Sequence, residues 1–240
     1  MARRRLLTGD ERRRLFDPPV QETAIIGHYT LSAEDVELVG RRYGPANRLG
    51  LAAQIALMRH PGFGLQPEIG LPDVILQYLA AQLFVDPSSF SAYGQRAQTR
   101  TDHADLVARY LGIRPFRRGD LALALNLAAQ AAEYTDRGEP IVRALMVGLK
   151  GERFILPSGD TLERAGLAGR ARARKAAAAA IVEGLSSAEL TRLDELVINN
   201  PDFGMTPLAW LRNFEEAPTA ANINGLLERL RYVRGIGIHP

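Results

Sequence analysis

The sequence of this chain predicts an all-α fold made of short helices. Hydrophobic residues recur at helical spacing along most of its 240 residues. Capping boxes, in which Ser or Thr precedes Asp or Glu by three residues, start several of these segments. Extended patterns are confined to residues 153–156 and 236–238. Helices are therefore expected to supply nearly all of the regular structure.

The first expected helix runs over residues 10–16, because Thr8 and Glu11 form a capping box and two prolines follow Asp17. Helix starts and stops later in the chain are marked by Pro, Gly and Ser at suitable positions. Further helices are expected over residues 32–42, 45–59, 72–84, 87–93, 102–111, 120–135, 140–150, 161–183, 186–199, 207–213 and 220–234.

Residues 32–59 have the pattern of a helix–turn–helix. Ser32 with Asp35 caps the first helix, and Gly44 ends it because glycine readily takes the left-handed conformation. Pro45 is pre-set for the first turn of the second helix. That turn presents Asn47 and Arg48, and in DNA-reading proteins of this type the first turn reaches the base edges.

Asn pairs bidentately with adenine and Arg with guanine, so Asn47 and Arg48 are the first candidate DNA contacts. The remainder of this helix is apolar nearly all round, and only Gln54 is added as a candidate. Gly50 lies on the same side, where it would admit either a sugar–phosphate strand or a close helix neighbour. The alternative for the whole segment is an ordinary pair of packed helices.

The pair Tyr43-Gly44 recurs fifty residues on as Tyr93-Gly94, again before a polar turn and a helix. This recurrence suggests a second helix–turn–helix unit, although it can also arise by chance. Residue types that contact phosphates and bases are concentrated in the second turn. The candidates here are Arg96, Gln98, Arg100 and Thr101. His103, in the helix that follows, is expected to be a core residue.

Basic charge is concentrated in the first three quarters of the chain. Residues 1–14 carry six arginines against two acids, residues 96–118 also six against two, and residues 164–175 five basic residues and no acid. Such a distribution suits a polyanion-binding surface. The arm with Arg3, Arg4 and Arg5 is a candidate for the minor groove, as in homeodomains, or else a solvated terminus. For residues 164–175 a solvated helix face is the favoured interpretation.

Other function classes find little support in the sequence. Absence of cysteine excludes disulfides and cysteine-ligated metals, and the four histidines lack metal-ligand spacing. No catalytic motif is found, so no catalytic residue, metal or cofactor is expected in this chain. With no run of 18 apolar residues and no signal-peptide core, a cytoplasmic protein without membrane contact is expected.

Several short motifs, in order along the chain, resemble the N-terminal region of Tn-three family transposases. They are RRRLLT at 3–8, HYTLS at 28–32, NRLG at 47–50, LGIRPF at 111–116, ILP at 155–157, LAWL at 208–211 and the closing HP. The resemblance implies recognition of the terminal inverted repeats of a transposon in double-stranded DNA. It also implies that the magnesium-dependent DDE catalytic core of such proteins lies outside this chain.

The resemblance further implies tandem helix–turn–helix-type DNA-binding domains followed by a helical linker or dimerisation segment. The corresponding ranges are residues 1–85 with the basic arm, 86–158 and 159–240. Two other functions are kept open: a helical module for protein–protein contact or dimerisation, and a free-standing helix–turn–helix transcriptional regulator. The acidic last quarter and an exposed-looking Trp210 and Phe214 favour the first of these.

Overall fold

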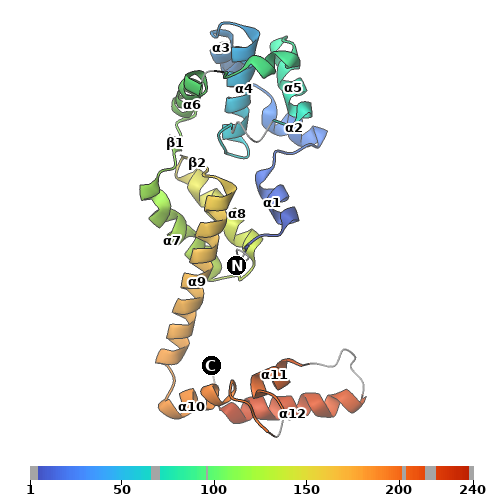
Figure 1. The fold of residues 1–240 in the computed structure, drawn as a ribbon, viewed down its shortest axis with the longest axis vertical. Coiled ribbons are helices and arrows are strands. Elements are labelled where there is room, and N and C mark those ends of the chain that lie inside the picture. The colour runs from blue at the N-terminus through green and yellow to red at the C-terminus, as the bar shows by residue number, and fades with distance from the viewer. Residues whose placement is uncertain (1–4, 66–70, 96, 202–203, 214–219, 238–240) are drawn as a thin grey trace. The chain divides into compact units, whose positions relative to one another are not determined.

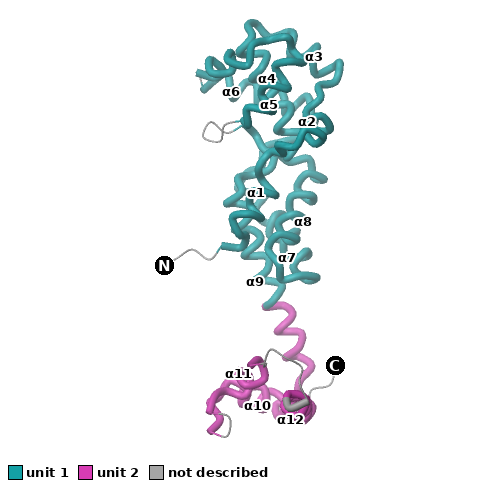
Figure 2. Tube along the Cα trace, turned by 90° about the vertical axis from the view of Figure 1, so that its right-hand side faces the viewer, with its two compact units in different colours: residues 1–174 teal, residues 175–240 magenta. Residues whose placement is uncertain are grey.

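A computed structural model describes the chain except residues 1–4, 66–70, 96, 202–203, 214–219 and 238–240. It contains two compact units, residues 1–174 and residues 175–240 (Figure 2). Each unit is described by itself. In the described residues the regular structure is almost entirely helical, which confirms the all-α prediction.

The first unit contains eight complete helices in its described part and the start of a ninth (Figure 1). They are α1 (Gly9–Phe16), α2 (Glu22–Tyr29), α3 (Ala33–Gly40), α4 (Pro45–Arg59), α5 (Asp73–Leu83), α6 (Ala97–Leu111), α7 (Leu121–Ala132), α8 (Gly138–Gly151) and α9 (Gly159–Glu183). Two 3-10 helices, η1 (Pro87–Ala92) and η2 (Arg118–Asp120), precede α6 and α7. The short strands β1 (Arg114–Pro115) and β2 (Phe154–Ile155) pair in parallel.

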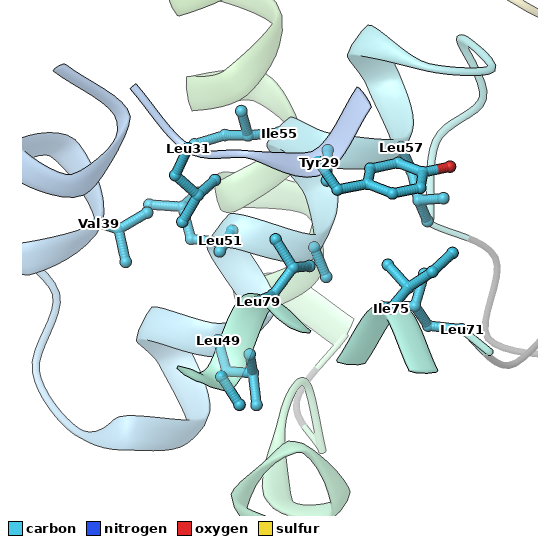
Figure 3. Packing of buried hydrophobic residues seen from close by; sticks show 14 of the residues in the cluster. Tyr29, Leu31, Val39, Leu49, Leu51, Ile55, Leu57, Leu71, Ile75 and Leu79 are labelled. Atoms are coloured by element: carbon cyan, nitrogen blue, oxygen red, sulfur yellow. The ribbon is translucent and has the colours of Figure 1, made fainter. Parts of the chain in front are cut away.

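Helix α4 is the centre of the first hydrophobic cluster (Figure 3). Residues 49–58 of this helix are all buried, and helices α2, α3, α5 and α6 pack round it with η1. Leu49, Leu51 and Ile55 have no exposed surface. Burial of an apolar side chain of this size stabilises the folded state by about 1.5–3 kcal/mol. This explains why α4 is apolar nearly all round.

A second cluster joins α7, α8 and the start of α9, and it includes residues from the N-terminus of the chain. Leu6, Leu7 and Leu15 pack here, although they belong to the expected domain 1–85. Conversely, Val107 packs in the first cluster, although it belongs to the expected range 86–158. The two clusters thus draw on both expected ranges, because residues 5–16 pack beside α8 and α6 packs on α4.

The helix boundaries follow the local signals where these are strong. Helix α4 spans Pro45–Arg59 as expected, and the capping boxes of Thr8, Ser32 and Ser186 are all formed. Helix α6 begins at Ala97 rather than residue 102, so the expected polar turn is largely helical. Helix α2 was not expected, since no side chain caps it and Gly27 lies within it. Ile236 ends a helix instead of forming a strand.

The second unit contains α10 (Ser187–Glu195), α11 (Pro207–Arg212) and α12 (Ala220–Ile236). Trp210 is only partly exposed, because its ring meets Tyr232 edge-on at 5.7 Å and lies under the Arg229 guanidinium at 5.2 Å. The expectation of an exposed Trp210 was therefore wrong. Phe214 lies outside the described residues. Of the described side chains within α10–α12, only that of Pro207 is buried.

Candidate nucleic-acid interface

The first turn of α4 lies at the surface. Gly44 precedes the helix with φ of 82°, a conformation that favours glycine, and Pro45 occupies the first turn. The Arg48 backbone N–H donates to the Gly44 carbonyl at 3.2 Å and starts the helical ladder. Residues 49–58 are buried, and Arg59, the last residue of the helix, is exposed again. A ligand that meets the N-terminal end of this helix therefore meets residues 45–48.

Asn47 and Arg48 are held by the backbone of the turn before them. The Asn47 Nδ2 donates to the Tyr43 carbonyl at 3.0 Å, and the Arg48 Nε donates to the Arg42 carbonyl at 3.0 Å. The Asn47 Oδ1 and the Arg48 terminal nitrogens form no hydrogen bond within the described part of the chain. Tyr43, beside them, is 95% exposed. These bonds restrict both side chains while leaving hydrogen-bonding atoms available.

Gln54 lies inside the protein, which differs from the expectation that it faces a ligand. It is 2% exposed, and its Nε2 donates to the Tyr93 hydroxyl at 2.8 Å and to the Arg100 carbonyl at 3.0 Å. The hydrophobic pattern could not distinguish a buried amide from a surface one. Gln54 therefore fixes η1 and α6 against α4 and is not retained as a DNA contact.

The same polar network includes His103. The Tyr93 hydroxyl lies 3.0 Å from His103 Nδ1, and the two rings stack with centroids 5.6 Å apart. Burial, with a smaller effect of the Arg42 charge, lowers the pKa of His103 and favours a neutral ring, whose Nδ1 can accept a hydrogen bond from the Tyr93 hydroxyl. His103 is 7% exposed, which confirms the prediction of a core histidine.

Gly50 serves close packing within the protein. A Cβ atom added there would lie 2.1 Å from the Tyr93 ring, so only glycine fits without a shift. The sequence left open whether Gly50 admits a sugar–phosphate strand or a close helix neighbour, and the structure shows a close neighbour within the protein, the Tyr93 ring. The Tyr93 contact and the Gln54 bonds together set the start of α6 against the first half of α4. Arg42 also lies near enough to His103 to affect its pKa.

The second group of candidates therefore lies close to the first. Gln98 and Thr101 are exposed in the first turns of α6, where Gln98 donates to Asp102 Oδ1 at 2.7 Å and Thr101 to the Ala97 carbonyl at 3.2 Å. Arg100 is half-buried and donates to the Gly94 carbonyl. Arg96 lies outside the described residues. The structure thus gathers side chains from the starts of α4 and α6 in one region of the first unit.

Asp35 locks the helices that carry this region. It is fully buried, and its carboxylate accepts two bonds from Arg59, at 2.7 and 2.8 Å, and one from the Tyr110 hydroxyl at 2.8 Å. The Ser32 backbone N–H donates to it at 2.8 Å. Burial acts to raise the pKa of Asp35, but these bonds outweigh it and hold the pKa below its usual value. The capping box was visible in the sequence, whereas the partners on α4 and α6 were not.

Arg42 is a neighbouring residue that the sequence analysis did not select. It lies in the turn between α3 and α4 and is half-buried. Its Nε is buried and lacks a hydrogen-bond partner among the described residues. Its position beside the Tyr43-Gly44 break was the available signal, but nothing in the sequence distinguished it from Arg41.

The basic arm is described only from Arg5, which is exposed; Arg3 and Arg4 lie outside the described residues. Leu6 and Leu7 anchor the arm in the second cluster, and the Leu7 backbone N–H donates to Glu163 Oε1 at 3.2 Å. The described part of the arm is therefore fixed to the second cluster directly after Arg5.

Three arginines of α9 bond to α7 and to the segment that follows it. Arg172 donates to Asn126 Oδ1 at 2.7 Å, and Arg174 forms an ion pair with Asp136 at 2.5 Å. Arg170 donates to the Asp136 carbonyl at 3.1 Å. These three side chains tie α9 to the second cluster.

Metal and membrane sites are not found in the described part of the chain. No group of three or more His, Cys, Asp or Glu side chains there could hold a metal ion. No helix among those residues is long and apolar enough to cross a membrane.

Comparison with known proteins places the chain in a family. The model of a domain of unknown function, DUF4158, matches residues 6–168. The chain belongs to the DUF4158 family. The DUF4158 match covers most of the first unit, including the starts of α4 and α6.

Three relatives of this DUF4158 chain are transposases. It is 33% identical to the transposase for transposon Tn501 of Pseudomonas aeruginosa over 98% of its own length, and 34% identical to that for Tn21 of Escherichia coli over 96%. The transposase for Tn1546 of Enterococcus faecium is 28% identical over 98% of the chain. The chain spans 23–24% of these relatives' lengths. The resemblance to transposases seen in the short motifs is thereby confirmed.

Proposed function

We propose that this chain is the part of a transposase that recognises the terminal inverted repeats of its transposon in double-stranded DNA. The observation that carries the proposal is the exposed first turn of α4, with Asn47 and Arg48 fixed after the Gly44 turn. The transposase relatives support the same function.

The roles of the side chains follow from their chemistry. Asn47 and Arg48 read bases in a major groove, adenine and guanine being the partners that suit them. Gln98, Arg100 and Thr101 contact the adjoining backbone together with Arg96, and Arg42 joins them from the turn. Arg3, Arg4 and Arg5 enter the neighbouring minor groove. The exposed Tyr43 supplies an apolar surface beside the same turn.

Catalysis is assigned to another part of the longer transposase. The chain spans about a quarter of its relatives, and magnesium would act in the remaining three quarters. In this proposal the chain requires no cofactor. It acts in the cytoplasm at the bacterial nucleoid, and the full-length transposase pairs with a second copy of itself.

The test is base discrimination by Asn47→Ala and Arg48→Ala. Affinity is measured by fluorescence anisotropy for the transposon end and for duplexes with one base pair changed. Each substitution should cost about 1–3 kcal/mol and abolish discrimination at one position, because a bidentate base contact is lost. The control for Arg48→Ala is Arg13→Ala, which removes the same charge from an arginine paired with Asp10, whereas Asn47→Ala removes no charge. If the two variants discriminate as the wild type does, the first turn of α4 does not read bases.

A second function, protein–protein contact, is favoured for residues 175–240. One face of α12 exposes apolar side chains at helical spacing. They are Ile223, Leu226, Leu227, Leu230 and Val233, each at least 40% exposed. Sedimentation of Leu226→Glu/Leu230→Glu beside the wild type tests it. If the wild type is a dimer and the variant is a monomer, the result supports this function. If the wild type and the variant both sediment as monomers, the result argues against self-association.

A further inference from the structure

A groove in the first unit lies away from the starts of α4 and α6. It has a volume of about 570 Å³ and is lined by residues from the η2–α7 segment and the beginning of α9, which lie side by side in Figure 1. Its apolar lining includes Phe116, Leu121, Leu125 and Pro157. Arg117, Arg118 and Arg164 also line it. These residues are called the arginine groove below.

The three arginines are exposed, and within the described part of the chain none of them forms an ion pair. Arg164 donates only to the Asp160 carbonyl at 3.2 Å and to Thr161 Oγ1 at 3.3 Å, both neutral groups. Other arginines of this unit, such as Arg12 and Arg143, are paired with carboxylates. The arginine groove therefore concentrates positive charge that the protein itself does not neutralise.

A neighbouring carboxylate, that of Asp120, is already engaged. Its Oδ2 accepts from the Arg117 backbone N–H at 2.7 Å, and its Oδ1 lies 3.6 Å from Arg114 Nη1. The Arg114 guanidinium also lies over the Phe154 ring, 3.8 Å from the centroid. Asp120 thus neutralises Arg114 and shapes the loop, while the charges of Arg117 and Arg118 remain available.

The loop that carries Arg117 and Arg118 is fixed at its start. Strand β1 pairs with β2 just before it, and Phe116 meets the Phe154 ring edge-on at 5.7 Å. Phe154 is 2% exposed. Arg164 stands on α9 two residues after the fully buried Leu162. A binding surface built on such anchored elements loses little conformational freedom when a ligand binds.

We infer that the arginine groove anchors the sugar–phosphate backbone of the same duplex that the start of α4 reads; this inference rests on the proposed function. Guanidinium groups bind phosphates bidentately, and the apolar lining suits the hydrophobic faces of deoxyribose. The arginines of the groove stand among apolar residues, with Thr161 as the one neutral hydrogen-bonding side chain of the lining, and we assign all three to phosphates rather than to base edges. It therefore adds affinity without adding sequence preference.

The experiment compares Arg117→Ala/Arg118→Ala/Arg164→Ala with wild type on the transposon end and on a scrambled duplex, from 50 to 200 mM salt. Three lost phosphate contacts should lower the salt slope by about 2.7, so the affinity loss over this range becomes about 40-fold smaller. Affinity at low salt should fall equally for both duplexes. The ratio of the two affinities should stay within twofold of the wild type.

Two further variants control for charge and folding. Arg13→Ala/Arg41→Ala/Arg143→Ala removes the same net charge from arginines that are paired with carboxylates, and its salt slope should change by less than about one. Arg117→Lys/Arg118→Lys/Arg164→Lys keeps the charge and should restore most of the slope. Circular dichroism should show all variants folded, because the substituted side chains are exposed.

Each remaining outcome is informative. A wild-type slope and affinity in the groove variant would overturn the inference and leave the groove to another ligand, such as an acidic protein segment. A selective loss on the transposon end would also overturn it, because the groove would then read sequence. If the wild type itself binds both duplexes equally, the proposed function fails, whereas the salt slopes still decide whether the groove contacts the backbone.

Discussion

Replacement of the buried Asp35 by Asn should destabilise the first unit, because four hydrogen bonds converge on its two carboxylate oxygens. The amide keeps one acceptor oxygen and turns an NH₂ group toward two donors. At least two bonds are lost, and bonds to charged groups contribute about 1.5–3 kcal/mol each. Arg59 is 38% exposed and can turn toward water, which reduces the penalty. We expect a loss of about 3 kcal/mol for Asp35→Asn at pH 7.

The assay is urea unfolding followed by circular dichroism. Tyr110→Phe removes only one of the four bonds and should cost about 1.5 kcal/mol, the low end of that range. The chain has one tryptophan, Trp210, which lies in the second unit. Its fluorescence transition therefore reports residues 175–240 separately and should be the same in both variants. That transition is an internal control for effects confined to the first unit.

The effect should depend on pH, because the folded pKa of Asp35 lies below its usual value. For such a group the stabilisation is present above the unfolded pKa of about 4 and is lost as pH falls through the folded pKa. The difference between wild type and Asp35→Asn should therefore shrink when the measurement is repeated near pH 3. A variant within 0.5 kcal/mol of wild type at pH 7, or a difference that does not change with pH, would refute this reasoning.

Two further substitutions test the packing of the first unit. Gly50→Ala would place a Cβ 2.1 Å from the Tyr93 ring and should destabilise the first unit by about 1–3 kcal/mol. Urea unfolding measures this loss, and an unchanged unfolding midpoint would contradict the packing. Burial and the neighbouring His28 lower the pKa of His60 to about 4, so NMR should find this ring neutral at pH 5.5. The unfolded chain then binds the proton first, and stability should fall as pH drops from 6.5 toward 4. His60→Gln should remove this part of the pH dependence.

The sequence was most informative where few residue types suit a local backbone conformation. Gly44 and Pro45 predicted the start of α4 correctly, because a left-handed turn and a fixed proline φ are local properties. The start of α6 was placed too late, since Asp102 looked like an N-terminal residue although the helix begins at Ala97. A polar turn and the polar first turn of a helix have similar amino-acid compositions. The sequence pattern therefore could not show whether residues 97–101 are a turn or helical.

The candidate site was predictable only in its surface chemistry. Asn47 and Arg48 lie where the sequence indicated, but Gln54 is buried because η1 and α6 pack over it. That packing is a tertiary contact between residues about forty apart, which periodicity does not encode. The arginine groove was missed for the same reason, since Arg164 meets Arg117 and Arg118 only when α9 folds beside α7.

The most direct test of the proposed function is the affinity of this chain for its own transposon end against a scrambled duplex. Fluorescence anisotropy at low and at physiological salt measures both. Sequence-specific recognition predicts that the transposon end binds at least about a hundredfold more tightly, or roughly 2.7 kcal/mol. Equal binding that disappears with salt would reduce the interface to a nonspecific basic surface, and no binding at all would leave protein–protein contact as the function of the chain.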